Sequence, residues 1–286
     1  MDNSSITTST VLLNDLSGNL INGTVYYDNS TFTIIFDPNQ DLLSFDNYTF
    51  TLSGIRDKAQ NSLGTTLTFL TGFAGSGTSN SPFLVPNAAA LDRIRDNLTA
   101  HYKLTSDIDL GGISNWNPIG PSFAGSFNGD NKTIKNLRVD NSTGTSVGLF
   151  SEIRNTVGGA IVENIKFTNS FVRGQNDVGT VAGLLADSSG TNPTNIIRNV
   201  TIDNATVKGQ SEVGGLVGSA FGLIEKVGIK QLKLFTTTSS GLNANAGGLV
   251  GDLNRGQIKE SFAEGIIDNQ SGRNKGGLSL IHIDAA

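Results

Sequence analysis

The sequence predicts an all-β protein, in which a β-sandwich is followed by a parallel β-helix, or solenoid. The main observation is an internal repeat. The segment Val213–Gly218 returns as Ala246–Gly251, looser copies begin at Val147 and Val178, and a clipped copy begins at Lys275. The copies are therefore separated by steps of 31, 35, 33 and 29 residues. A recurrence of this length predicts stacked repeats rather than one irregular domain.

A second recurring piece predicts the strands of each repeat. It comprises Ile161–Phe167, Ile197–Ile202 and Ile224–Ile229, in which apolar and polar positions alternate as in a strand with one buried face. Such a strand cannot bury its apolar face alone, but stacked repeats form one continuous core. We therefore expect one repeat per coil, with coils about 4.8 Å apart.

Glycine and asparagine fit this architecture. The chain has 35 glycines, and they cluster at equivalent places in the repeats, where turns favour positive φ. Asn136, Asn164 and Asn199 are expected to lie in register, with Lys226 and Glu260 replacing asparagine in the following repeats. Stacked asparagines can form a hydrogen-bonded ladder; plain solvent exposure is the alternative.

The repeats resemble a known family. Gly247–Gly251, Gly256, Ile258 and Ser261–Gly265 are similar to the GLUG repeat, with Phe262 as its aromatic residue and Glu264 in place of the usual threonine. GLUG repeats occur in bacterial surface proteins and beside the catalytic part of immunoglobulin A metallopeptidases. We place GLUG-type repeats at residues 145–277.

Residues 1–72 predict the sandwich. Five short strands separated by turn residues are expected at Thr10–Leu13, Thr24–Tyr27, Thr31–Phe36, Tyr48–Leu52 and Thr66–Leu70. This region resembles the bacterial Ig-like domain of S-layer and other surface proteins, on motifs that include Met1-Asp2, Gly23–Asp28, Phe36–Pro38 and Gly54–Asn61. In that family a first strand precedes the Met-Asp pair. The resemblance therefore implies a sandwich truncated at its N-terminus, with an exposed sheet edge.

Residues 73–82 predict a Gly/Ser linker, and residues 83–144 a capping helix with the first coil or coils. The helix is expected at Pro86–Leu98, with Asn87 as its N-cap and with Leu91, Ile94 and Leu98 on one face. A solenoid needs its open end covered; the alternative is an amphipathic helix that binds a partner. Next come segments similar to the entry region of GLUG-type proteins: Tyr102–Leu110, Trp116–Gly120 and Phe123–Gly129.

Residues 278–286 are expected to be a non-native tail, because Leu278–Ile283 resembles the translation of a transposon sequencing adapter. On this interpretation the last coil has no cap.

Composition excludes several classes of function. The net charge is −5 and the sequence shows no Lys/Arg cluster, so we expect no nucleic-acid partner. The sequence has no apolar run of about 18 residues, so we expect no membrane insertion in this fragment. The chain has no cysteine, so it has neither disulfides nor thiolate metal sites. Met1–Ser5 is polar and acidic, unlike a secretory signal.

The sequence offers few chemically reactive residues. A metallopeptidase needs a His-Glu-x-x-His helix, but the only histidines are His101 and His282. Asp107 and Asp109 would lie on the same side of a strand, where they could act in glycoside hydrolysis or bind Ca²⁺. The structural alternative is that both acids lie at a solvated edge around buried Ile108.

Three other polar or aromatic residues have structural alternatives. Asn128 and Asp130 fit turn chemistry. Trp116 could stack on a sugar, but it could equally pack inside the first coil. We therefore predict no catalytic residue and no cofactor, with Asp107 and Asp109 as the only candidates for a calcium site.

The function expected from these observations is a non-enzymatic fragment of an exported cell-surface protein. Its β-helix would serve as a stalk or adhesion region and its Ig-like domain as a spacer. The partner would be a surface protein or glycan of a host or neighbouring cell. Two alternatives are a non-catalytic accessory region of a secreted metallopeptidase of the immunoglobulin A peptidase type, and a polysaccharide-acting β-helix enzyme.

Overall fold

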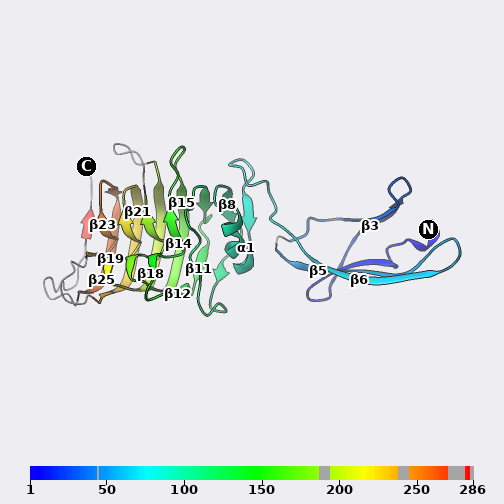
Figure 1. Cartoon of the computed structure of the whole chain (residues 1–286), viewed down its shortest axis with the longest axis horizontal. Coiled ribbons are helices and arrows are strands. Elements are labelled where there is room, and N and C mark those ends of the chain that lie inside the picture. The colour runs from blue at the N-terminus through cyan, green and yellow to red at the C-terminus, as the bar shows by residue number, and fades with distance from the viewer. Residues whose placement is uncertain (44, 187–193, 238–244, 270–280, 284–286) are drawn as a thin grey trace. The chain divides into compact units, whose positions relative to one another are not determined.

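The protein is all-β, with parallel sheets in its larger part, as the sequence predicts. The computed structural model describes residues 1–43, 45–186, 194–237, 245–269 and 281–283. It comprises two compact units, Met1–Ala74 and Gly75–Ala286, here called the N-terminal and C-terminal units (Figure 1).

The N-terminal unit consists of antiparallel strands. A 3-10 helix at Asn3–Ser5 precedes β1 (Val11–Asp15), β2 (Leu20–Ile21), β3 (Gly23–Asp28), β4 (Thr33–Pro38), β5 (Asn47–Arg56) and β6 (Ser62–Leu70). One sheet has the order β2-β1-β5-β6, and β3 and β4 form a hairpin. All five predicted strands are present, and the small core contains Ile6, Val11 and Ile55.

The C-terminal unit contains the helices and the parallel strands. Its first part comprises β7 (Phe83–Val85), α1 (Ala88–Asp92), a 3-10 helix at Arg93–Asp96, β8 (His101–Leu104), β9 (Ile108–Asp109), β10 (Ser126–Asn128), β11 (Thr133–Lys135), β12 (Arg138–Asp140), β13 (Thr145–Val147) and β14 (Phe150–Ile153). Its second part comprises β15 (Ile161–Arg173), β16 (Asn176–Val178), β17 (Ala182–Leu185), β18 (Ile196–Gly209), β19 (Ser211–Gly214), β20 (Val217–Ala220), β21 (Leu223–Thr236), β22 (Ala246–Gly247), β23 (Val250–Leu253), β24 (Gln257–Lys259), β25 (Ser261–Asn269) and β26 (Ile281–Ile283).

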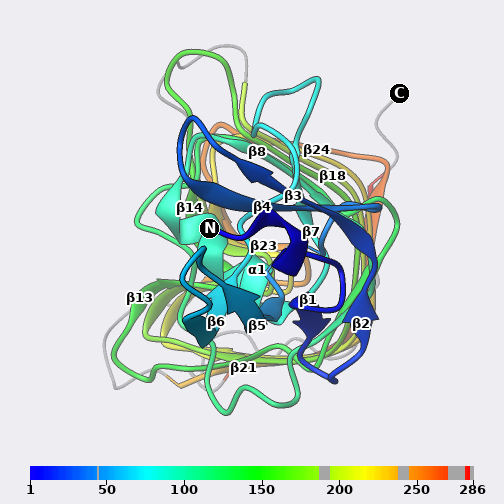
Figure 2. The same ribbon diagram turned by 90° about the vertical axis from the view of Figure 1, so that its right-hand side faces the viewer.

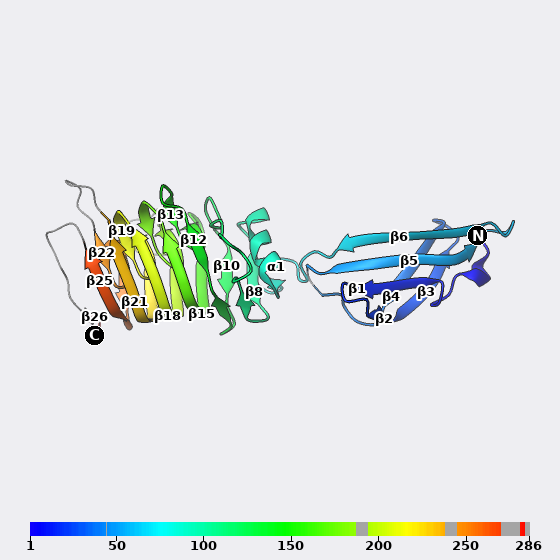
Figure 3. The ribbon, with the colours of Figure 1, turned by 90° about the horizontal axis from the view of Figure 1, so that it is seen from below.

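These strands form three parallel stacks, of which the two shorter ones begin with strands β13 and β14. The largest runs through β8, β10, β15, β18, β21 and β25, which lie side by side in Figure 3. The other stacks are β13-β16-β19-β22 and β14-β17-β20-β23. Seen along the stack, the successive repeats overlie one another (Figure 2).

The predicted repeat spacing is confirmed by this pairing. Val147 pairs with Val178, Val178 with Val213, and Val213 with Ala246. The predicted fifth copy, at Lys275, lies outside the described residues.

Asparagines with left-handed backbone bend the long strands at two corners. Asn164 and Asn199 lie in register at the first corner, with φ of 55° and 52°, and Lys226 and Glu260 continue that column. The Asn199 Nδ2 donates to Asn164 Oδ1 over 2.9 Å, so the predicted ladder forms there. Asparagine suits these corners because it tolerates the left-handed region better than most residues do.

The sequence-based prediction that Asn136 lies in the column of Asn164 and Asn199 is wrong. Because Lys135 pairs with Thr168, Asn136 lies in register with Asn169 and Asn204 at a second corner, five residues further along each repeat. The Asn204 Nδ2 donates to Asn169 Oδ1 over 2.8 Å. The error arose because both corners have the same local pattern, an asparagine followed directly by a buried residue.

One recurring glycine is required by close backbone approach. Gly183, Gly218 and Gly251 each face a residue of the preceding repeat that has left-handed backbone: Ser146, Asp177 or Glu212. A Cβ atom on these glycines would lie 2.2, 2.3 or 2.4 Å from that backbone. This contact explains why the last glycine of the recurring motif is retained in the repeats from Val178 onwards.

The interior of the stack is apolar. Val162, Ile197 and Ile224 pair in register and are completely buried. Aromatic rings fill the N-terminal end of the same core, where Tyr102 and Phe123 have ring centroids 6.3 Å apart. Burying such a column removes apolar area from water at about 25 cal/mol per Å².

The predicted capping helix is shorter than expected. Asn87 caps it as predicted, accepting from Ala90 N over 2.9 Å, but α1 ends at Asp92 and a 3-10 turn follows. Leu91 and Ile94 are buried, whereas Leu98 lies beyond the helices and is half-buried. The chain leaves the helix because Leu98 O accepts backbone hydrogen bonds from Ala124 and Gly125.

The predicted linker is partly folded onto the C-terminal unit. Thr78 and Ser81 form an antiparallel bridge, and Gly77 O accepts from His101 N over 2.9 Å. Its Gly/Ser composition therefore reflects a tight turn as well as a connection.

At the other end, the predicted non-native tail is only partly described. Residues 278–280 and 284–286 lie outside the described residues, whereas β26 pairs antiparallel with β25, with Ile283 opposite Ser261. The backbone edge of the last repeat is therefore paired over this short stretch.

Gly218→Ala is expected to lower the free energy of unfolding by about 1–3 kcal/mol, because the added methyl group overlaps backbone. Gly112→Ala is the matched control, because a Cβ there meets nothing within 4 Å. Its effect should stay within about 1 kcal/mol. Chemical denaturation of both variants tests this, and equal stabilities would contradict the close approach.

Candidate functional site

Asp107 and Asp109 are exposed at the first repeat, and the second repeat engages their carboxylates. The Asp107 Oδ1 accepts from Thr133 N over 2.9 Å, and its Oδ2 lies 3.2 Å from Lys135 Nζ. The Asp109 Oδ1 accepts from Asn136 Nδ2 over 2.7 Å and from Gly111 N over 2.8 Å. These contacts support the structural interpretation, in which both acids join one repeat to the next.

The same contacts lower the pKa values of both carboxyl groups. The Thr133 N–H, followed by Lys135, lowers the pKa of Asp107 below its usual value. The Asn136 side chain, followed by the Gly111 N–H, lowers the pKa of Asp109. Neither carboxylate is therefore poised as a general acid near neutral pH.

The surroundings of the pair do not favour calcium. Within the part of the chain that the structure describes, no group of three or more histidine or acidic side chains could hold a metal ion. The Lys135 ammonium already neutralises one of the two carboxylates. Calcium usually takes six to eight oxygen ligands, so this pair would supply only a small part of such a shell.

The remaining sequence candidates also have local partners. The His101 Nδ1 lies 2.6 Å from Ser126 Oγ on the neighbouring strand. The Asn128 Oδ1 accepts from Asp130 N over 2.8 Å, as expected for turn chemistry. Asp130 also forms an ion pair with Lys103 at 3.4 Å. Each of these groups is thus engaged by a neighbouring strand or by its own turn.

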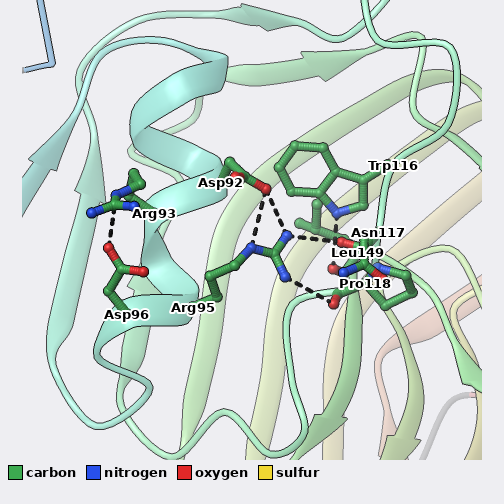
Figure 4. Close-up of polar contacts among 8 residues, drawn as sticks. All are labelled: Asp92, Arg93, Arg95, Asp96, Trp116, Asn117, Pro118 and Leu149. Atoms are coloured by element: carbon green, nitrogen blue, oxygen red, sulfur yellow. Dashed lines mark hydrogen bonds and ion pairs between the residues drawn. The ribbon is translucent and has the colours of Figure 1, made fainter.

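Trp116 is buried and joins the first repeat to the helical segment (Figure 4). Its Nε1 donates to Leu149 O over 3.3 Å, and the Arg95 guanidinium lies 6.0 Å from the ring centroid. Arg95 also pairs with Asp92 at 2.6 Å and donates to Asn117 O over 3.0 Å. The packing alternative for Trp116 is therefore correct, and Arg95 connects the helical segment to the first repeat.

One cleft lies in the N-terminal unit. It has a volume of about 480 Å³ and is lined by β1, β2 and the segment from Asn39 to Tyr48. Of its acidic residues, Asp15 accepts from both the backbone and the side chain of Asn19, at 2.8 and 2.9 Å. No chemistry follows from this lining.

Sequence reasoning missed the columns of side chains on the outer faces of the stack. One column runs through Lys103, Asn128, Glu163, Arg198 and Glu225, because these residues are paired in register across five strands. Its charges compensate one another, with the Arg198 guanidinium 2.7 Å from the Glu163 carboxylate. The polar positions of each strand were visible in the sequence, but the columns depend on register between repeats of unequal length.

Comparisons with known proteins relate the chain to parts of much longer ones. It is 35% identical to halomucin of Haloquadratum walsbyi over 166 residues, which are 51% of this chain and 2% of halomucin. It is 32% identical to a putative Gly-rich membrane protein of Evansella cellulosilytica over 108 residues, 34% of this chain and 12% of that protein. It is 28% identical to an S-layer protein of Geobacillus stearothermophilus over 130 residues, 44% of this chain and 10% of that protein.

The matched region thus spans an eighth or less of each relative. No family model matches the chain. The helices in the described residues are all too short to cross a membrane. The similarities indicate a surface protein.

Asp107→Asn is expected to flatten the pH dependence of unfolding in acid. A carboxylate whose pKa is lowered by folding stabilises the protein above its unfolded pKa, near 3.8, and that contribution is lost as the pH falls through the lower folded value. Denaturation between neutral pH and pH 3 measures the effect. Asp203→Asn is the control, because the Asp203 side chain is exposed and its carboxylate has no hydrogen bond or ion pair within the described residues. The same pH profile for wild type and Asp107→Asn would contradict the assignment.

Proposed function

We propose that this chain is a non-enzymatic region of an extracellular cell-surface protein. Its C-terminal unit is a parallel β-helix of GLUG-type coils that acts as a stalk and presents its side faces for adhesion. Its N-terminal unit is an Ig-like spacer. The partner is a protein or glycan of a host or neighbouring cell surface.

The observation that carries this proposal is the in-register parallel stack. Eleven of the thirteen residues of β15 pair with β18, and β18 pairs in turn with β21. Each added repeat extends the same core and the same outer faces by about 4.8 Å. Such a construction suits a rigid spacer, because its length grows by repetition without a new core.

The outer surface supports adhesion more than catalysis. Interior positions such as Val162, Ile197 and Ile224 are filled by apolar side chains, and outer positions carry polar ones. The two acids that could serve a polysaccharide-cleaving enzyme, Asp107 and Asp109, accept hydrogen bonds from the next repeat within the stack.

The cellular location is supported by the comparisons. One relative is named as an S-layer protein and another as a putative membrane protein. The chain covers only small parts of these relatives, so an accessory region of a secreted metallopeptidase remains the second candidate. Both candidates place the chain outside the cell and assign it no chemistry.

Surface exposure is tested on intact source cells with an antibody raised against the C-terminal unit. We expect the antibody to label unpermeabilised cells and protease treatment of intact cells to remove the epitope. An antibody against a cytoplasmic protein controls for lysis. Labelling that appears only after permeabilisation would contradict the proposal.

The absence of enzymatic activity is tested with the full chain and a panel of neutral and acidic polysaccharides. We expect no new reducing ends above those produced by heat-denatured protein. Millimolar calcium should change the melting temperature of the protein by less than about 1 °C, because an ion that does not bind the folded protein does not stabilise it. Cleavage or calcium stabilisation that is lost in the folded double variant D107A/D109A would overturn this assignment.

A further inference from the structure

A row of basic side chains crosses one outer face of the C-terminal unit. It consists of Arg138, Arg173, Lys208 and Lys233, here called the cationic strip. One residue comes from each of the strands β12, β15, β18 and β21. These strands pair consecutively in parallel, so the strip follows the direction in which the repeats stack.

Register fixes the spacing of the strip. Arg138 stands in the column of Phe171 and Lys233. Arg173 and Lys208 stand in the next outward column, whose two ends are Asp140 and Asp268. The two columns are separated by two residues along each strand, so both face outward. One cation therefore occurs per strand, at steps of about 4.8 Å along the stack.

Two phenylalanine rings contact two of these four cations. The Arg138 guanidinium carbon lies 4.5 Å from the centroid of the Phe171 ring. The Lys208 Nζ lies between two rings, 5.8 Å from the centroid of Phe171 and 5.1 Å from that of Phe235. Both rings are half-buried. Such cation–π contacts restrict the long side chains, which lowers the entropy cost of ordering them around a ligand.

The two halves of the strip differ in their ion pairs. Asp140 bridges Arg138 and Arg173, at 2.6 and 2.5 Å, and fixes both guanidinium groups. Lys208 and Lys233, in contrast, have no carboxylate partner within the described residues. The strip thus keeps unneutralised positive charge on a protein whose net charge is −5. The face before the first corner differs, because Arg198 there pairs with Glu163.

The spacing of the strip identifies the class of ligand. One cation per strand matches a linear chain that carries one negative charge per sugar, because a strand spacing is close to the length of one pyranose unit. Nucleic acid fits less well, because each strand of B-DNA places a phosphate about every 3.4 Å along the axis. Thr206 and the exposed Ile266 lie in the column of Phe171, where they offer small and apolar surface to sugar rings.

We propose that the cationic strip binds a linear acidic polysaccharide, with a carboxylate or sulfate on each sugar, laid along the stack. This proposal rests on the proposed extracellular function and names its partner.

The test measures binding of the full chain to immobilised polygalacturonate, dextran sulfate and neutral dextran. We expect binding to at least one acidic polymer and none to dextran. The affinity should fall as salt rises from 0.01 M to 0.15 M, since the screening length shrinks from about 30 Å to about 8 Å. Polygalacturonate and dextran sulfate together distinguish a carboxylate ligand from a sulfate ligand.

Two double variants distinguish binding by the cationic strip from general electrostatic attraction to the protein. Replacing both unpaired lysines in K208Q/K233Q should weaken binding about fivefold, the scale expected for two exposed charge contacts. The control K166Q/K230Q removes two exposed lysines from β15 and β21 on the adjoining face, and it should weaken binding less than twofold. Unchanged unfolding transitions would establish that both variants fold.

Three results would overturn the proposal: no binding to either acidic polymer, equal losses in the two double variants, or tighter strip-dependent binding to single-stranded or duplex DNA. Failure here is distinguishable from failure of the proposed function. A protein that is labelled on intact cells but binds neither polymer refutes only the strip, whereas a protein found only inside cells refutes the function whatever it binds.

Discussion

The structure depends on the left-handed backbone at the corners of each repeat. Asn164, Asn199 and Lys226 adopt this conformation in register, and Asn169, Asn204 and Gln231 repeat it five residues later. A shift of one residue between repeats would move the corners out of line and turn the apolar face of every strand outward. The corners therefore hold the interior apolar and the outer columns polar. The close approach of Gly218 to Asp177 applies the same constraint in the other two stacks.

The proposed function follows from the same constraint. Because register is preserved from repeat to repeat, outer residues that are more than thirty positions apart in sequence lie about one strand spacing apart. A ligand that follows the stack thus meets a regular series of side chains. Small changes at single outer positions can then alter a surface without altering the core. This explains how Arg198 can form an ion pair with Glu163 while Lys208, on the same strand, contacts two phenylalanine rings instead.

The sequence predicted the repeat, the strands and the nature of the interior, because each depends on local patterns. The pairing of Val147, Val178 and Val213 follows directly from the recurring motif. Register at the corners was predicted only in part: Asn164 and Asn199 were assigned correctly, but Asn136 was not, since both corners share one local pattern. The helix was predicted too long, because hydrogen bonds to Leu98 O from Ala124 and Gly125 are tertiary. The cationic strip could not be predicted, because repeats of unequal length conceal which residues become neighbours.

Substitution of Asn199 tests the central claim most directly. This residue is exposed, so changes in core packing do not obscure the effect of backbone conformation. Both Asn199→Gly and Asn199→Val remove the hydrogen bond to Asn164. Valine is the better strand former, yet the left-handed conformation costs a residue with a Cβ roughly 1–2 kcal/mol. If the corners determine the register, the valine variant has the lower free energy of unfolding. A valine variant as stable as the glycine variant would contradict the account.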